Sequence, residues 1–214
     1  MGKTVIFKNG VSIVGGYSIV GQKEKDGPLG KTFSKCIGKC CYYGEKTHEG
    51  AERKMFEEAI AGAIEDSKLD KEQIDLLFAG DLLNQIISSS FAARTHNIAF
   101  VGTYGACSTM ALTLATAACM IEGGSVNTAV CAAGSHFATA ERQFRQPLEL
   151  GNQRPPQSQW TVTGVGATVL AGMLGPVNCG KPKIASVTFG KVVDFGVNDV
   201  NNMGASMAPE CYIL

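Results

Sequence analysis

The chain has 214 residues, with 19 basic and 19 acidic side chains and a formal net charge of zero. This length suits one sizeable core or two small domains. Only 18% of the residues are charged and no basic block occurs, which argues against nucleic acid as a partner. The eight cysteines are unevenly spaced, unlike a small disulfide scaffold, so we expect free thiols in a reducing compartment.

The N-terminus does not resemble a secretion signal, because Lys3, Lys8 and Asn9 interrupt its apolar residues. The uncharged run from Phe100 to Ile121 is long enough to cross a bilayer, which takes roughly 20 residues. However, this run also contains several threonines, a serine and two glycines. A buried core helix therefore explains it better than a membrane span, and we expect no signal peptide and no transmembrane segment.

Apolar spacing and turn residues divide the chain into alternating helices and strands. The expected elements, in chain order, are short strands and turns over 3–20, a charged loop over 21–30, an irregular segment over 31–48, a helix over 49–69, a strand over 74–80, a helix over 88–96, a strand over 98–102, a helix over 107–122, a strand over 127–134, a loop over 145–160, and strands over 161–172 and 183–196. The continuous apolar strands are typical of a parallel sheet, with the last two strands antiparallel at its edge. Helix–strand alternation with short connections predicts an α/β fold whose sheet is covered on both faces.

Cys107 is the first candidate for chemistry. It follows the expected strand 98–102 after a short turn and stands at the first turn of the next helix. The unpaired N–H groups and the positive dipole end of a helix favour a thiolate at such a position. A nucleophile is therefore one interpretation, and a buried structural cysteine, like Cys119 or Cys131, is the other.

His136 and two arginines follow the next expected strand, 127–134. Ligand groups gather beyond the carboxyl ends of strands in open α/β sheets, so His136 could share one mouth with Cys107. The alternative is a histidine in a surface loop. Arg142 and Arg145 lie three residues apart on an expected helical turn, where they would either clamp a carboxylate or phosphate or form an ordinary solvated, ion-paired face.

Metal and nucleotide sites find little support. Cys36, Cys40, Cys41 and His48 include one cysteine pair at the spacing that zinc prefers, without a second pair. The stretch TGVGATV has Val169 where a dinucleotide-binding fingerprint needs its third glycine, and it opens a strand rather than a helix. We therefore expect no metal and no cofactor.

Several stretches together resemble a known family. GACST ahead of an uncharged helix looks like the nucleophile turn of the thiolase and β-ketoacyl synthase superfamily, and GVGATVLAG resembles the glycine-rich strand pair that ends the first half of that fold. More closely, the chain resembles the stage V sporulation protein AD family through KEKDGPLG, IDLLFAGDLLNQ, YGACSTM, SHFATAERQFR, TVTGVGA and GKVVDFGVNDVNNMGASMAP. These stretches span nearly the whole chain.

The resemblance implies a thiolase-like fold of layered α/β/α type, of which this chain holds the N-terminal half. Residues 1–203 correspond to that half and residues 204–214 to the start of the second, so we expect a C-terminally truncated chain. In the complete fold the second half covers the uncharged helix that starts at Cys107. Without that cover the helix exposes an apolar face, and we expect the chain to form a homodimer or a larger oligomer.

The resemblance also implies a role and partners. The family handles dipicolinic acid, the pyridine dicarboxylate that spores store with calcium, and works with membrane proteins of the same operon. The first hypothesis is therefore a dipicolinate-binding component of spore uptake or transport, located in the cytoplasm or peripherally at the spore inner membrane. Basic side chains suit a planar dianion, and the candidates are His136, Arg142, Arg145, Lys23 and Lys25.

Two other functions stay open. Cys107 matches the nucleophile position of the superfamily, so an acyltransferase that forms a thioester on Cys107 is the second hypothesis. The activating bases of those enzymes belong to the second half of the fold, and no histidine follows His136, so Cys107 is either a nucleophile or a vestigial one. The third hypothesis, suggested by the ending ECYIL, is a non-functional remnant of a disrupted gene.

Overall fold

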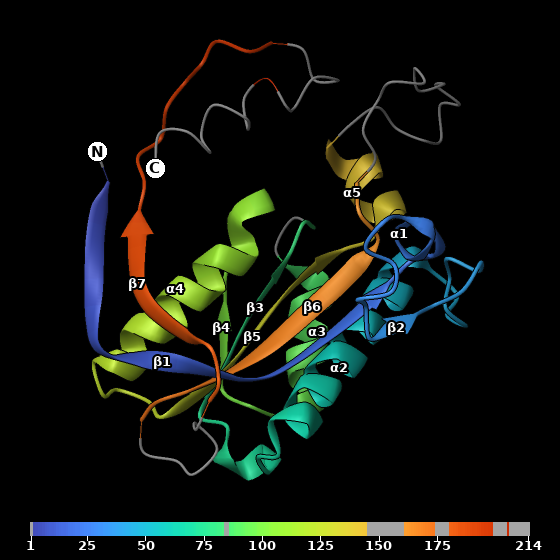
Figure 1. Ribbon diagram of the computed structural model, residues 1–214. Coiled ribbons are helices and arrows are strands. Elements are labelled where there is room, and N and C mark those ends of the chain that lie inside the picture. The colour runs from blue at the N-terminus through green and yellow to red at the C-terminus, as the bar shows by residue number, and fades with distance from the viewer. Residues whose placement is uncertain (1, 84–85, 145–160, 174–179, 199–204, 206–214) are drawn as a thin grey trace.

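One mixed sheet with helices on both faces forms the body of the protein (Figure 1). The computed structural model describes residues 2–83, 86–144, 161–173, 180–198 and 205. Its elements are β1 (Lys3–Val20), α1 (Gln22–Asp26), β2 (Lys35–Cys36), α2 (His48–Ser67), β3 (Leu76–Asp81), α3 (Ile87–His96), β4 (Phe100–Gly102), α4 (Thr109–Glu122), β5 (Thr128–Ser135), α5 (Phe137–Phe144), β6 (Gly164–Ala171) and β7 (Lys183–Phe189), with 3-10 turns η1 (Lys71–Gln73) and η2 (Ala106–Ser108). The α/β class and the alternation of helices and strands are confirmed.

The strand order places the parallel strands β5, β3 and β4 at one end of the sheet, and the short β2, parallel to β1, at the other. Within the described residues the order is β2-β1-β6-β5-β3-β4, and β7 pairs with β1. β3 runs parallel to β4 and β5, as the apolar runs predict, whereas β6 is antiparallel to both β5 and β1. The expectation that 161–172 lies at the sheet edge is therefore wrong. β6 is an interior strand because β1, from the other end of the chain, pairs along its free side.

β1 is one long strand, not the predicted series of short strands and turns. Its first half pairs with β7 and its second half with β6, and Figure 1 shows it changing direction between them. The glycines accommodate this bend: Gly10 has a φ of +72°, and the register with β7 shifts between Ile6 and Val11. Gly15 lets α2 approach, since a Cβ there would lie 2.5 Å from Ala63 O. Glycine in this segment therefore bends and packs a strand instead of ending it.

The two faces of the sheet carry separate cores, because successive strand residues point to opposite sides. On one side, α2 and α3 cover a cluster that includes Leu77 and Val130. On the other side, α4 packs over a cluster that includes Phe78 and Cys131. The prediction of a sheet covered on both faces is confirmed.

The uncharged run from Phe100 to Ile121 divides into strand β4, turn η2 and helix α4. None of the helices in the described ranges combines the length and apolar character that crossing a membrane requires. α4 buries one stripe against the sheet, formed by Thr109, Thr113, Ala117, Ala118 and Ile121. Its other side is only partly covered in this chain: Ala111 is exposed, and Met110 and Leu114 are half-buried.

Two smaller expectations need correction. The charged segment 21–30 contains the short helix α1, which ends where Gly27 N–H donates to Glu24 O. The strand expected over 183–196 ends at Phe189, and the residues that follow lie exposed without regular structure. Spacing alone did not reveal a five-residue helix, because it gives barely one turn of periodicity.

Candidate functional site

The carboxyl ends of three parallel strands meet at one edge of the sheet. Asp81 ends β3, turn η2 follows β4, and His136 follows β5. β3 lies between the other two strands, so the ends of β4 and β5 are separated by roughly 10 Å, two strand spacings. Cys107 and His136 therefore share an edge of the sheet, as expected, without being neighbours on it.

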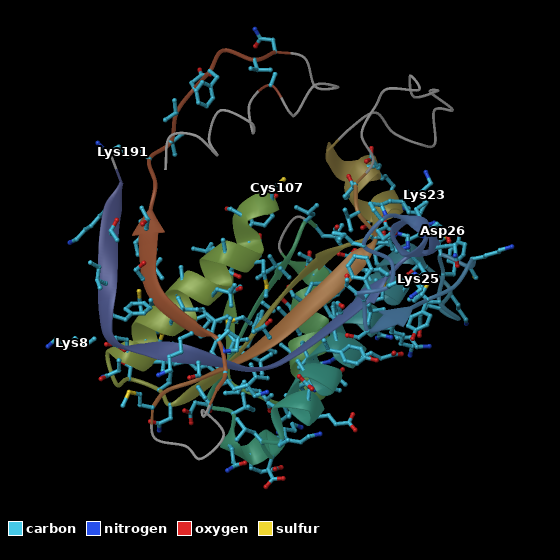
Figure 2. The ribbon with its side chains drawn as sticks, viewed as in Figure 1. Lys8, Lys23, Lys25, Asp26, Cys107 and Lys191 are labelled. Carbon is cyan, nitrogen blue, oxygen red and sulfur yellow. The ribbon has the colours of Figure 1, made fainter. Side chains whose placement is uncertain are left out.

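Cys107 is exposed in the turn that leads into α4, and Figure 2 shows it at the tip of that helix. The turn is tight: Ala106 has a φ of +48°, Gly105 N–H donates to Thr109 Oγ1 at 3.1 Å, and Ser108 Oγ donates to Gly105 O at 2.7 Å. Beneath it, Gly80 of β3 approaches so closely that a Cβ would lie 1.9 Å from Thr103 O. This geometry presents a thiol to solvent at a helix N-terminus, as the sequence predicts.

His136 is fully buried. Ala138 N–H donates to its Nδ1 at 3.2 Å, so the ring proton is on Nε2, which donates to Cys41 O at 2.9 Å. Burial lowers the pKa of His136 to about 4, although the bond to Cys41 opposes the change and His48 adds to it. The imidazole is therefore neutral near pH 7, with both nitrogens bonded to the backbone. It is not the surface histidine that the sequence left as the alternative.

Four rings form a continuous stack around His136. Tyr42 and His48 stack with centroids 4.3 Å apart, His48 and His136 lie 4.9 Å apart, and His136 and Phe137 lie 5.1 Å apart. Burial, followed by the charge on Arg142, lowers the pKa of His48. The stack joins the loop before α2 to the start of α5, so His136 acts here as a packing and positioning group.

The other predicted basic residues lie in different settings. Arg142 forms an ion pair with Glu49 of α2. Arg145 lies outside the described residues. On α1, Lys25 donates from Nζ to Gly30 O at 2.8 Å, and Lys23 is exposed (Figure 2). The structure therefore brings Lys23 near the start of α5, whereas Figure 2 shows both lysines far from Cys107.

A cavity of about 230 Å³ lies between α1, the segment after β2 and the start of α5. We call it the α1–α5 pocket, and its lining consists of residues 21–24, 37–39, 41, 137, 161 and 163. Two cationic side chains, Lys23 and Lys39, and one aromatic ring, Phe137, line it together. The carboxylate of Glu24 also lines it, but one of its oxygens accepts Thr163 N–H at 3.1 Å.

Thr163 holds the walls of this pocket together. Its carbonyl accepts Gly21 N–H at 2.8 Å, and its hydroxyl accepts Phe137 N–H at 3.0 Å. The backbone of Ile37 is tied to the sheet through a bond to Val20 O at 3.0 Å. The pocket was not predicted from the sequence, because its walls come from distant segments: Glu24 and Thr163, for example, are 139 residues apart.

Cysteines elsewhere do not form a metal site in the described part of the chain. No three His, Cys, Asp or Glu side chains there are grouped closely enough to hold a metal ion. Cys131 is enclosed in the core under α4, and burial raises the pKa of its thiol to about 12. Cys107, by contrast, is exposed.

Sequence comparison identifies the family of this chain. The chain matches the family model described as stage V sporulation protein AD over residues 1–212. It belongs to this family. The stage V sporulation protein AD of Bacillus subtilis (strain 168) is 42% identical over 207 residues, which are 97% of this chain and 60% of that protein. The chain thus spans less than two thirds of the length of this relative.

Solved structures show which fold the stage V sporulation protein AD family shares. An OleA variant from Xanthomonas campestris has a TM-score of 0.51 at 18% identity and covers 78% of this chain and 57% of its own. The 3-oxoacyl-[acyl-carrier-protein] synthase III of Aquifex aeolicus has a TM-score of 0.51 at 14% identity, covering 78% and 55%. The family resemblance and the thiolase-like fold expected from the sequence are both confirmed.

Proposed function

We propose that this sporulation protein binds dipicolinate in the α1–α5 pocket, as a component of its uptake into the spore. The observation that carries the proposal is the lining of that pocket by Lys23, Lys39 and the ring of Phe137. Dipicolinate is a planar aromatic ring with two carboxylates. Two ammonium groups suit the carboxylates, and an aromatic side chain suits the ring face.

The pocket walls supply further complementarity. The hydroxyls of Thr161 and Thr163 line the same cavity, and that of Thr163 already accepts a bond from the start of α5. Glu24 opposes an anion, but its carboxylate accepts Thr163 N–H, which offsets part of its charge. Among the ligand residues predicted from the sequence, Lys23 lines this pocket. Arg142 supports the pocket from outside through its ion pair with Glu49.

Calorimetric titration with dipicolinate tests this proposal. Replacing both lysines, Lys23→Ala with Lys39→Ala, should weaken binding about tenfold or more, since hydrogen bonds to charged groups contribute about 1.5–3 kcal/mol. Lys25→Ala is the matched control: it removes one charge from the same short helix but leaves the pocket lining intact, so binding should stay within about twofold. Picolinate, with a single carboxylate, should bind more weakly. Equal affinity in the double variant and the control would contradict the proposal.

The partners follow from the same role. We expect a peripheral protein that works at the spore inner membrane with membrane proteins of its operon, and that forms a homodimer or oligomer. β4 is the last strand in the sheet order of the described residues, and its outer edge is suited to pairing with a second copy. Light scattering tests the assembly: Val101→Lys in β4 should reduce the mass of the particle, and a monomeric wild-type chain would contradict it.

Acyl transfer through Cys107 is the second candidate, favoured by the exposed thiol at the head of α4. The thiolate sulfur would attack the carbonyl carbon of an acyl thioester, forming a new carbon–sulfur bond as the thiolate of coenzyme A leaves. Intact-mass spectrometry after incubation with acyl-CoA should then show one acyl adduct that Cys107→Ser abolishes. Cys40→Ser, which removes another exposed cysteine, should leave the adduct unchanged.

A further inference from the structure

Glu52 is a carboxyl group enclosed in the protein. It lies on α2 and has no exposed surface, because strand β3, helix α3 and helix α5 surround it. Its Oε2 lies 2.7 Å from Thr139 Oγ1 of α5, whose hydroxyl proton also has His136 O within reach at 2.9 Å. When Glu52 is protonated, it can donate to Thr139 Oγ1 while Thr139 donates to His136 O. Glu52 Oε1 has no hydrogen-bond partner among the described residues, and the buried hydroxyl of Ser88 from α3, which lies beside it, has none either. An enclosed carboxyl with one unpaired oxygen is unfavourable in its charged form.

A second buried acid makes that charge more unfavourable. Asp81 ends β3 and is almost completely enclosed. Burial raises the pKa of Asp81, but N–H groups of Leu83 and Ser89, which donate to it at 2.9 and 2.7 Å, oppose that rise by stabilising its ionised form. Burial raises the pKa of Glu52 to about 8, and the charge on Asp81 adds to the rise, whereas the hydroxyls of Thr139 and Ser88 oppose it.

No described cation offsets a charge on Glu52. The other titratable or charged groups within one turn of Glu52 on α2 are His48, Glu49, Arg53 and Lys54, those at or within α5 are His136, Glu141 and Arg142, and those on α3 are Arg94 and His96 in its last turn. Arg53 pairs with Glu45 and Glu57, and Lys54 donates to Tyr43 O. His136 is neutral near pH 7, and Arg142 is paired with Glu49. Asp81 is therefore the charge that acts on Glu52, and it is repulsive.

α5 depends on side-chain contacts for its position. It has eight residues and is held to α2 through Thr139 and Arg142. A third contact joins Glu141 Oε1 to the N–H and hydroxyl of Thr161, at 3.0 and 2.7 Å. Its first residue, Phe137, and Thr161 both line the α1–α5 pocket. A shift of α5 away from α2 would therefore move one wall of that pocket.

We infer that protonated Glu52 fixes α5 against α2, and that loss of this proton releases α5 and opens the wall of the α1–α5 pocket. Release allows water to reach the carboxylate, which removes the cost of a buried charge beside Asp81. α5 yields before the other elements because β3 and α3 contribute side chains to the packed core, whereas α5 has eight residues, contributes none to that core, and is attached by polar contacts and by ring packing at its start. The consequence for ligand binding rests on the function proposed above.

The direction of the pH effect follows from proton linkage. The closed arrangement holds the proton up to a pH of about 8, whereas an exposed glutamate loses it near 4.5. The closed arrangement therefore becomes less favourable as pH rises between these two values, by up to about tenfold per pH unit, and changes little above them.

Hydrogen exchange measured by mass spectrometry tests the inference without any ligand. Rates are corrected for the intrinsic effect of pH, and peptides covering α5 are compared with peptides covering β5. Between about pH 6 and 8, α5 protection should fall by up to about tenfold per pH unit and then level off, while β5 protection changes little. In Glu52→Gln, whose side chain cannot ionise, α5 protection should be independent of pH.

Two further variants separate this inference from a general loss of structure. Glu49→Gln removes the same charge from α2 at the ion pair with Arg142, and should keep the pH dependence of wild type. Thr139→Val removes the hydroxyl that binds Glu52, and should lower α5 protection already at about pH 6. Constant α5 protection in wild type would overturn the inference. So would a pH dependence that persists in Glu52→Gln.

Titration with dipicolinate at several pH values then tests whether the contact between Glu52 and α5 affects binding in the α1–α5 pocket. Affinity should fall from about pH 6 to 8 in wild type and stay constant in Glu52→Gln. If dipicolinate fails to bind at every pH, the proposed function is wrong and the exchange data alone decide the role of Glu52. If binding occurs but its affinity is the same at each pH, release of α5 does not open the pocket.

Discussion

Cys107 and His136 each follow a parallel strand at the same edge of the sheet, yet they lie in opposite environments. The thiol of Cys107 is exposed on a tight turn at the head of α4. The imidazole of His136 is fully buried, with both nitrogens bonded to backbone groups. Cys107 has access to solvent but no described base beside it, whereas His136 is a base without access to solvent.

The topology of the sheet therefore decides at which edge a residue lies, but not the direction in which its side chain points. Parallel strands bring the residues after them to one side of the sheet. Whether a side chain then points outward depends on the next helix: α4 starts beyond Cys107, whereas α5 and the 41–48 loop close over His136. The edge therefore divides into an exposed thiol site and, around α5, a separate pocket.

The largest expected effect is on stability. His136→Ala removes two hydrogen bonds and a ring packed between His48 and Phe137, and should lower the free energy of unfolding by about 3 kcal/mol. Cys107→Ala, at the exposed end of the comparison, should change it by less than about 0.5 kcal/mol. Urea denaturation measures both. Similar losses in the two variants would mean that the environments are not as different as described.

The pH dependence of stability is a second test of the burial of His136. The pKa of His136 is about 4 in the folded chain and near 6.5 when the side chain is exposed, so the unfolded chain binds an extra proton between these values. In the Glu52→Gln background, which removes the opposing effect of Glu52 protonation, the free energy of unfolding should therefore fall as pH drops from about 6.5 to 4, by up to about 1.4 kcal/mol per pH unit. His136→Gln, whose amide can still donate to Cys41 O, should reduce this slope. An unchanged slope in urea denaturation at several pH values would show that His136 does not cause it.

Backbone strain in the Cys107 turn should have a smaller effect. Ala106 adopts a φ of +48°, which disfavours a residue with a Cβ, so Ala106→Gly should raise the free energy of unfolding by roughly 0.5 kcal/mol. The control is Ala111→Gly, at an exposed position inside α4, which should lower it by about 1 kcal/mol. Effects of the same sign at both positions would argue against strain at Ala106.

The smallest expected effect concerns ligand binding. Cys107→Ser should change the affinity for dipicolinate by less than about twofold, because Cys107 does not line the α1–α5 pocket and changes at separate sites are usually independent. Calorimetric titration of the variant measures this. A tenfold loss would indicate that one ligand reaches both regions of the edge.

Much of the fold was predictable because its signals are local. Residues three and four apart identified α2, and continuous apolar runs identified β3 and β5 as buried parallel strands. The position of Cys107 between β4 and α4 follows from the same alternation. The placement of β6 inside the sheet could not be predicted in this way, because two strands with similar apolar patterns can pair in several orders.

The pocket around α5 was predicted less well than the turn around Cys107. Lys23 was among the candidate ligand residues, whereas Lys39, Phe137 and Glu52 were not. Nothing in the neighbouring sequence distinguishes Glu52 from the exposed acids of an amphipathic helix, although it belongs to the buried face of α2. Its significance comes from Thr139, Ser88 and Asp81, which reach it from three other elements.

The alternation of helices and strands, the turn that carries Cys107 and the family of the chain can all be read from the order of its residues. These properties depend on spacing within a few residues or on identity along the chain. Only the tertiary structure decided that β6 is an interior strand, that His136 is buried and neutral, and that Thr163 joins α1 to α5. The physical reason is that burial and hydrogen bonding between distant segments arise when the sheet and its helices pack, and they change the properties of side chains that look alike in the sequence.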